Sequence, residues 1–506
     1  MKLKVYLVAI SLFLFISTSS RTSASPWMEA ADLSLRADLQ LLNDTGAINL
    51  PVTTYPLMWA SVAPELKKLD QSKLSEMQLN AYLHVRRKMN FAVQRSFKNK
   101  VKGHFGKEER RFTSFGSDHS AQAEVSLSSE YTGKNFAGKI KINYQNKDAI
   151  SVDENEAHLD GSYIAYKLSN WVLDAGATKK WWGPGIDTSL ILSTNARPLP
   201  AIAIRRNNSQ AFETPWLSWI GPWTFTAQIA HLEHERFVAD AKLWNSRATF
   251  KPFKNLELGL SWSYQWGGKG QPETLDQFID GLLGRTECVD GSASCGEELQ
   301  TKLGNQLAGF DGRWSGTIGG TPYAIYAQSI GEDSPSPGTL EISDKSFLYG
   351  LETQFSLLEQ RMLLNIEYTD TQANCGADGD TSQDCFYEHS IYRTGYRYNQ
   401  RSIGSTYDND AETLSLTLIS RLLNRDAWKF KLRQMDLNTN NRDRHANDPL
   451  LGNSVSKIAD ELTLVSFEYL FNTQYGNYTL GVIANDSSVY DKEYNLFVDF
   501  EIFFAQ

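Results

Sequence analysis

Apolar and polar residues alternate with a period of two from about Val101 to the end of the chain, which is the pattern of β-strands. Over 256–266, leucines and aromatic residues occupy one face, while Glu, Gly, Ser and Gln occupy the other. The same division recurs over 347–357, 428–433 and 494–504. Segments of about ten residues with one apolar and one polar face are typical of transmembrane barrel strands, which have lipid outside and a wet or plugged lumen inside.

The connectors between these strands fall into two alternating classes. Short ones lie near 132–135, 169–170, 220–222, 252–255, 358–360 and 473–476. Long ones lie near 146–157, 181–210, 267–304, 331–346, 372–411 and 438–458. The strands between them number about 18, an even count that is typical of outer-membrane barrels. We therefore predict a mainly β fold, a transmembrane antiparallel β-barrel with its long loops facing the exterior. A soluble sandwich or propeller is the alternative, but the alternation of short and long connectors favours the barrel.

The N-terminal region has a different pattern. Two lysines, a short apolar run and small polar residues up to Ala24 are typical of a secretory signal peptide. Leu35, Leu39 and Leu42 then recur at helical spacing, and two more helical stretches follow over 62–69 and 75–94. Such a unit is too small to bury a large core alone, so we expect it to pack against the barrel. The predicted organisation is a signal peptide over 1–24, a periplasmic helical bundle over 25–98 and a barrel over 99–506.

Composition and charge narrow the function class. The net charge of −9 gives no reason to expect a nucleic-acid partner. The mean hydropathy of −0.40 would be typical of a soluble protein, but a membrane barrel also has a polar mean because only alternate residues of each strand face lipid. Since no later apolar run is long enough for a membrane helix, a membrane location requires a barrel.

Four cysteines lie in two close pairs, Cys288 with Cys295 and Cys375 with Cys385. Three pairings are possible, and the exported location together with proximity favours the two local disulfides. Zinc binding is the alternative, but the spacing is not that of a zinc knuckle and no histidine cluster accompanies the cysteines. We expect no metal and no cofactor.

Tryptophan, tyrosine and arginine are the side chains that a polysaccharide site requires, because sugars present C–H faces, hydroxyls and carboxylates. Two strand ends, Trp181–Gly185 and Gln265–Gly270, bring tryptophan to what we predict is the outward rim. The candidate polysaccharide-binding residues are Trp181, Trp182, Arg197, Arg205, Arg206, Trp266, Lys269, Tyr392, Arg393, Tyr396, Arg397 and Tyr398. For each tryptophan the alternative is the aromatic girdle at the lipid boundary.

The inward basic residues Lys429, Lys431 and Arg433 are more readily explained by pairing with inward carboxylates or with the plug. The histidines of 231–235 do not indicate a metal site, because on a strand His231 and His234 point to opposite faces. No serine, histidine and acid set is singled out by its spacing, so no catalytic residue is predicted.

An ordered set of short motifs resembles the Wzi capsule-assembly family. These motifs are Leu35–Leu39, Asn43–Leu50, Tyr55–Leu57, Trp181–Gly185, Gly221–Trp223, Leu256–Gly259, Gln265–Gly270 and Gly304–Asp311. The resemblance implies an outer-membrane barrel of 18 strands with the helical bundle plugging its periplasmic mouth. It also implies a lectin, with no catalysis, that helps to hold capsular polysaccharide on the cell surface. The cysteine-bearing loops depart from the family pattern.

Our leading hypothesis is therefore a non-enzymatic outer-membrane lectin that binds and anchors exported capsular polysaccharide during capsule assembly. The expected partners are that polysaccharide, outer-membrane lipid and the polysaccharide-export machinery. The alternative is a porin-like channel for sugars or other small solutes, and a membrane-barrel hydrolase is a third hypothesis.

Overall fold

The computed structural model describes residues 26–94, 97–117, 121–146, 156–283, 304–332, 343–373, 384–422, 425–445, 447–448 and 450–505. The predicted signal peptide over 1–24 lies outside these residues.

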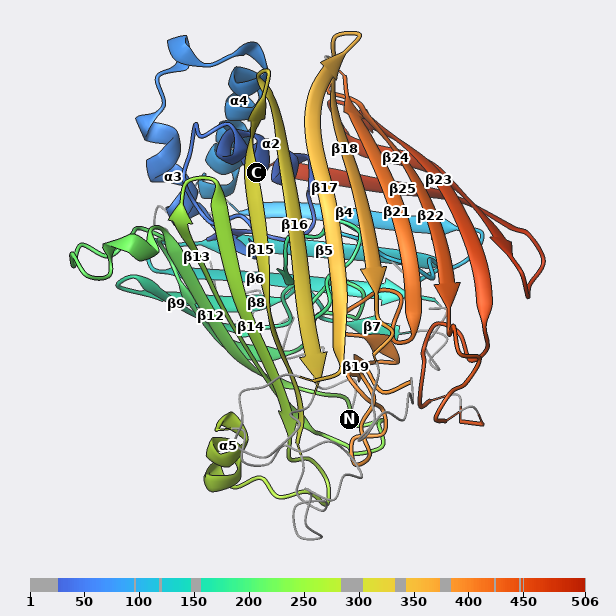
Figure 1. The fold of residues 1–506 in the computed structure, drawn as a ribbon. Helices are drawn as coiled ribbons and strands as arrows, with labels where there is room; N and C mark the ends of the chain where they lie inside the picture. The colour runs from blue at the N-terminus through green and yellow to red at the C-terminus, as the bar shows by residue number, and fades with distance from the viewer. Residues whose placement is uncertain are drawn as a thin grey trace.

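A closed barrel of 18 antiparallel strands forms most of the molecule, as predicted (Figure 1). In chain order the strands are β4 (Lys98–Gly106), β5 (Ala123–Thr132), β6 (Phe136–Gln145), β8 (Tyr163–Leu168), β9 (Trp171–Gly176), β11 (Ala201–Arg206), β12 (Trp223–His231), β13 (Lys242–Phe253), β14 (Leu256–Trp266), β15 (Asn305–Ile318), β16 (Thr321–Glu332), β17 (Lys345–Leu357), β18 (Gln360–Asp370), β21 (Ala411–Arg421), β22 (Ala427–Leu437), β23 (Asp460–Asn472), β24 (Gly476–Ser487) and β25 (Glu493–Ala505). The short β7 (Glu156–His158) and β8 pair with opposite ends of β6 and share one strand position. The last strand pairs with the first, Ala505 opposite Lys98, which closes the barrel.

The period-two pattern separates the two faces of each strand as predicted. Leu260, Phe310 and Ile325 are exposed on the outside of the barrel, where lipid would cover them. Their neighbours Ser261 and Asp311 point inward and are buried. The apolar exterior and polar interior are those of a membrane barrel.

Three helices lie at one end of the barrel (Figure 1). They are α2 (Leu33–Asp44), α3 (Trp59–Lys68) and α4 (Glu76–Val93), with the 3₁₀ turn η1 (Gln71–Lys73) between the last two. Local sequence fixes where they begin. The carboxylate of Asp32 accepts from the Leu35 N–H at the start of α2, and Ser75 with Gln78 forms a capping box at the start of α4.

Helix α2 is buried almost completely, including polar side chains such as Arg36, Asp38 and Gln40. It enters the mouth of the barrel, where Asp44 pairs with Arg313 of β15 and Asp38 pairs with Arg361 of β18. The helical region therefore plugs this end. The short strands β1 (Trp27–Met28), β2 (Thr54–Tyr55) and β3 (Leu57–Met58) belong to the same region. Among the described residues, no helix combines the length and the apolar character needed to cross a bilayer.

Two connectors at the opposite end fold into the lumen. The 177–200 connector contains β10 (Trp181–Trp182), which pairs with β2 of the plug. The described part of the connector between β18 and β21 contains β19 (Arg397–Tyr398) and β20 (Arg401–Ser402). Helix α5 (Leu275–Leu282) lies at the same end (Figure 1). The lumen is thus filled from both sides.

One predicted connector was wrong. The sequence indicated a single long loop over 181–210, but residues 201–206 form the barrel strand β11. The connector between β11 and β12 then runs over 207–222 on the side of the plug, and it contains η2 (Ser218–Ile220). The predicted strict alternation of short and long connectors therefore fails at this position.

Candidate functional site

Asp187 holds the 177–200 connector inside the lumen. Its carboxylate accepts from Lys431 and Arg433 of β22, and the Arg433 Nη2–Oδ1 distance is 2.8 Å. The backbone N–H groups of Asp187 and Thr188 donate to Glu367 Oε2 at 3.0 and 3.4 Å. Burial alone would raise the pKa of Asp187, but Arg433 and Lys431 hold it well below its usual range. The predicted pairing of the inward basic residues with the plugged lumen is confirmed at this point.

Arg397 holds the second luminal connector. Its guanidinium donates to Asp408 at 2.7 and 2.8 Å and to Glu388 at 2.6 Å, and all three side chains are buried. Burial raises the pKa of Glu388 to about 7, although Arg397 acts in the opposite direction. Because Asp408 and Glu388 occupy its donors, the Arg397 guanidinium stabilises the loop and is not available to an external ligand.

Trp181 and Trp182 lie inside the barrel, which corrects their predicted place at the outward rim. Both are fully buried, and β10 pairs them with Tyr55 and Thr54 of the plug. The indole N–H of Trp181 donates to the Gly185 carbonyl at 2.9 Å, and its ring packs edge-on against Phe115. Trp181 and Trp182 therefore join the 177–200 connector to the helical plug.

Arg205 and Arg206 lie on β11 close to the plug, and the prediction that they belong to an outward loop was wrong. Arg206 pairs in register with Trp171, next to the turn between β8 and β9. Arg205 points inward, donates to Asp174 and lies over the ring of Trp27. Arg206 lies over Trp223, 3.7 Å from the ring centre.

Four aromatic candidates are also buried. Tyr392, Tyr396 and Tyr398 pack inside the loop bundle, where the Tyr396 hydroxyl donates to the Ile191 carbonyl at 2.9 Å. Trp266 faces the outside of the barrel, stacks on Tyr264 and is covered by Phe278 of α5. None of these four rings has an exposed face that a polysaccharide could contact.

The remaining candidates lie at the outer surface. Lys269 and Arg393 are exposed, and the Arg393 guanidinium lies 4.8 Å from the ring centre of Phe237, which is itself 52% exposed. Arg197 is half-buried and pairs with Asp160 and Glu156. Arg393 over Phe237 is thus an open pair of cation and aromatic ring, the combination that binds an acidic sugar.

A second group of basic residues, which the sequence analysis did not single out, lies close to Arg393. Arg444 is exposed on the connector after β22, and Lys457, which pairs with Asp443 at 3.1 Å, follows on the same connector. Burial lowers the pKa of His445, Asp443 acts in the opposite direction, and the neighbouring positive charges of Arg393, Arg444 and Lys457 lower it further. The signal available in the sequence was the charged run Arg442–His445 inside a predicted long loop. We call Phe237, Arg393, Arg444 and Lys457 the outer basic surface.

His231 and His234 do not point to opposite faces, because strand β12 ends at His231. Both imidazoles lie near Asp240, at 3.7 and 2.9 Å, and all three side chains are largely exposed. They belong to the rim of the outer surface.

Cys288, Cys295 and Cys375 lie outside the described residues. Cys385 is described and is not a free thiol. The two local pairings therefore stay predictions.

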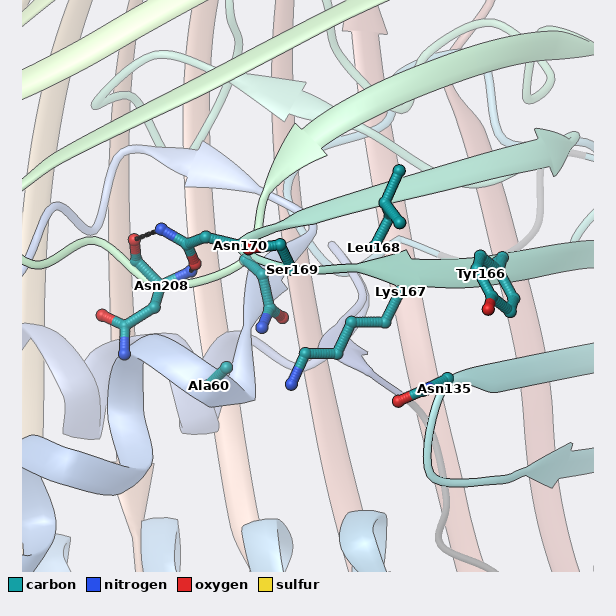
Figure 2. A pocket seen from close by; sticks show the side chains of 9 residues that line it. Ala60, Asn135, Tyr166, Lys167, Leu168, Ser169, Asn170 and Asn208 are labelled. Carbon is teal, nitrogen blue, oxygen red and sulfur yellow. Dashed lines mark hydrogen bonds between the residues drawn. The ribbon is translucent and has the colours of Figure 1, made fainter.

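Figure 2 shows a polar hollow of about 620 Å³ at the plug end, between α3 and the turn from β8 to β9. Asn170 and Asn208 join its two sides, with the Asn170 side chain donating to the Asn208 carbonyl at 3.2 Å. Lys167 is the charged residue of its lining. The hollow brings together none of the predicted sugar-binding residues.

Comparison with known proteins identifies the family. Residues 92–491 match the capsule assembly protein Wzi family. An uncharacterized 55.8 kDa protein in the cps region of Klebsiella pneumoniae is 32% identical over 375 residues, which cover 74% of this chain and 70% of the relative. A solved structure of Wzi from Escherichia coli has a TM-score of 0.80 and 26% identity, and the match covers 94% of this chain and 99% of the other. That protein is described as an outer-membrane protein involved in group 1 capsule assembly and as a carbohydrate-binding β-barrel.

The cellular location follows from the barrel fold and from the similarity to the Escherichia coli outer-membrane protein. An 18-stranded barrel with an apolar exterior, similar over nearly its whole length to an outer-membrane protein, lies in the outer membrane. The plug, the short turns beside it and the 207–222 connector then face the periplasm, and the other long connectors face the exterior. On the extent of these matches, the chain belongs to the capsule assembly protein Wzi family.

Proposed function

We propose that this protein is a non-enzymatic lectin that binds exported polysaccharide at the outer basic surface and anchors it to the cell during capsule assembly. The observation that carries the proposal is the exposed Arg393–Phe237 pair beside Arg444 and Lys457. Arginine binds carboxylates through two parallel hydrogen bonds, and an aromatic face packs against sugar C–H groups. The carbohydrate binding attributed to the Escherichia coli relative supports the same conclusion.

The filled lumen supports binding over transport. From the periplasmic side α2 enters the barrel, and from the exterior the 177–200 connector is held by Asp187. The two are joined where β10 pairs with β2. The filled interior therefore supports the connectors that form the outer surface. Local disulfides would make the cysteine-bearing loops more rigid still.

A repeating polymer can be held by weak individual sites. Many barrels in one membrane contact the same chain, so avidity replaces high affinity at each barrel. An acidic polysaccharide is the best complement to this surface, because Arg393 of the β18–β21 connector and Arg444 and Lys457 of the β22–β23 connector all lie within electrostatic range of His445.

The proposal is tested in a strain that lacks the gene. We expect complementation with the wild-type gene to restore cell-bound polysaccharide, and Arg393→Gln with Arg444→Gln to leave it in the medium. Lys254→Gln, in the exposed β13–β14 turn on the periplasmic side, is the matched control and should behave as wild type. Equal retention with and without the gene would contradict the proposal. Stable open pores of the intact protein in planar bilayers would favour the porin-like alternative instead.

A further inference from the structure

The helical plug leaves a large cavity at the periplasmic mouth. The cavity has a volume of about 1300 Å³ and lies between the plug and the barrel wall, with α4 on one side and β18, β21, β22 and β25 on the other. Its size is sufficient for several sugar residues. The outer basic surface lies at the opposite end of the barrel, so this cavity is a separate feature.

Most charges in the cavity are matched by a partner. Lys139 pairs with Glu29, Lys88 with Asp32, Lys429 with Glu468, and Arg110 with Asp499, while Lys100 and Lys102 share Glu501. These pairs are links within the wall, within the plug or between the plug and the wall, and they need no ligand to explain them.

The charges around α4 and the end of β21 are different. Asp38 is one carboxylate that accepts from His84, Arg361 and Arg421 together. Close by, Arg87 of α4 and Arg425 of the β21–β22 turn line the cavity, and neither has an ion pair among the described residues. Partial burial and the like charge of Arg425 lower the pKa of Arg87, while Asp32 and Asp38 act in the opposite direction. Positive charge therefore exceeds negative charge at this place.

The same face of α4 carries exposed apolar surface. Leu83, Arg87 and Phe91 are spaced four residues apart and lie on one side of the helix, toward the cavity. Phe91 is 45% exposed, and its ring meets the ring of Phe503 of β25 edge-on at 5.9 Å. Lys98 lies 4.7 Å from the ring centre of Phe91 and Lys100 lies 5.7 Å from that of Phe503, so partly open rings and cations occur together here as they do on the outer surface.

We propose that this cavity is a second binding site, for carboxylate-bearing sugar residues of an acidic glycan that reaches the barrel from the periplasm. Arg87 and Arg425 bind the carboxylate, since guanidinium groups without an ion pair can each offer two donors to it. Phe91 and Phe503 pack against the sugar rings. The choice of a glycan as ligand rests on the proposed function, whereas the position of the site does not.

The test uses the full-length protein in detergent and a photo-crosslinkable oligogalacturonate. Cross-linked peptides are mapped by mass spectrometry, so that the periplasmic cavity and the outer surface give separate signals. We expect cross-links to α4, and we expect Arg87→Gln with Arg425→Gln to reduce them about tenfold while cross-links to the outer connectors persist. Lys67→Gln with Lys73→Gln, on the helical region but outside the cavity lining, is the charge-matched control and should leave both signals unchanged.

Cross-links confined to the outer connectors would overturn this inference and leave the proposed function standing. Loss of the outer signal alone in Arg393→Gln with Arg444→Gln, with the α4 signal intact, supports two independent sites. A neutral malto-oligosaccharide that labels α4 equally well would contradict the role of the arginines. Inorganic phosphate that competes better than chloride at equal ionic strength and as well as the glycan would show a simple anion site, which also overturns the inference.

Discussion

The Arg433 guanidinium of β22 donates from Nη2 to Oδ1 of Asp187 across 2.8 Å, although the two residues are 246 positions apart in the chain. This contact joins the barrel wall to the 177–200 connector, which β2 of the plug and Glu367 of β18 also hold. The same carboxylate accepts from Lys431, and both cations are buried. Asp187 is therefore the main electrostatic link that keeps the lumen filled from the outside.

Replacing that carboxylate should open the barrel. Asp187→Asn leaves Lys431 and Arg433 buried without a counter-charge, a change that typically costs ~3–5 kcal/mol. We expect the inner loop to leave the lumen and single-channel conductance in planar bilayers to rise above that of the wild type. Asp486→Asn, which breaks the exposed pair with Lys492, should leave conductance unchanged. A closed Asp187→Asn barrel would show that other contacts hold the loop.

The pair of Asp44 and Arg313 should govern docking of the plug. Arg313 Nη2 lies 2.8 Å from Asp44 Oδ2 and 3.3 Å from Glu352 Oε1, and all three side chains are buried. Asp44→Asn alone should accelerate limited proteolysis of the helical region. Asp44→Asn combined with Arg313→Met should be less damaging than the sum of the single changes, because both single changes break the same direct contact. Strict additivity of the two effects would argue against direct coupling.

Acid should release the plug. Burial would raise the pKa of Glu29, but Lys139 and the nearby Lys100 lower it to about 2, and Lys88 with His84 likewise lowers the pKa of the partly exposed Asp32 to about 2. The depressed pKa of Glu29 stabilises docking of the plug above the unfolded value of about 4.5, that of Asp32 stabilises the contact of α2 with α4 above about 3.8, and both contributions are lost as the pH falls toward 2. Pepsin cleavage of the helical region should therefore rise steeply over that window. In Glu29→Gln the rise in cleavage should be smaller. An unchanged pH profile of cleavage would contradict the assignment of this pH dependence to Glu29.

The buried side chain of Lys180 should destabilise the folded protein near neutral pH. Burial and the like charge of Arg205 lower its pKa to about 7, although Asp174 acts in the opposite direction. Its ammonium donates to the Thr178 carbonyl at 3.2 Å. Because the unfolded state holds the proton up to about pH 10.5, stability should rise as the pH increases from about 7 to 10.5. Lys180→Met should be more stable than wild type at pH 7 and should lack that rise in denaturant unfolding; an identical slope would refute the prediction.

The strands could be predicted from the sequence because each carries its own period-two pattern. The faces of 256–266 and the inward position of Lys431 and Arg433 were predicted from local sequence alone. Strand β11 was missed because its six residues follow two prolines and carry two arginines at the end, which is typical of a loop. A local pattern is too weak to define a strand that short.

The inward folding of the outer connectors could not be predicted. Trp181 and Trp182 stand before a glycine-rich turn, as rim aromatics do, and nothing nearby shows that they pair with Thr54 and Tyr55. Likewise the sequence gives no sign that Arg397 is neutralised by Glu388 and Asp408 and not presented to a ligand. Contacts between residues distant in the chain decide both cases.

The most direct test of the central claim is binding of purified capsular polysaccharide from the same strain to the purified barrel. We expect wild-type protein in detergent to bind it with an affinity that falls as salt is added, since the contact is electrostatic. Arg393→Gln with Arg444→Gln should weaken binding about tenfold or more, while Lys254→Gln should not. No binding by the wild type, or equal binding by all three proteins, would contradict polysaccharide binding at the outer basic surface.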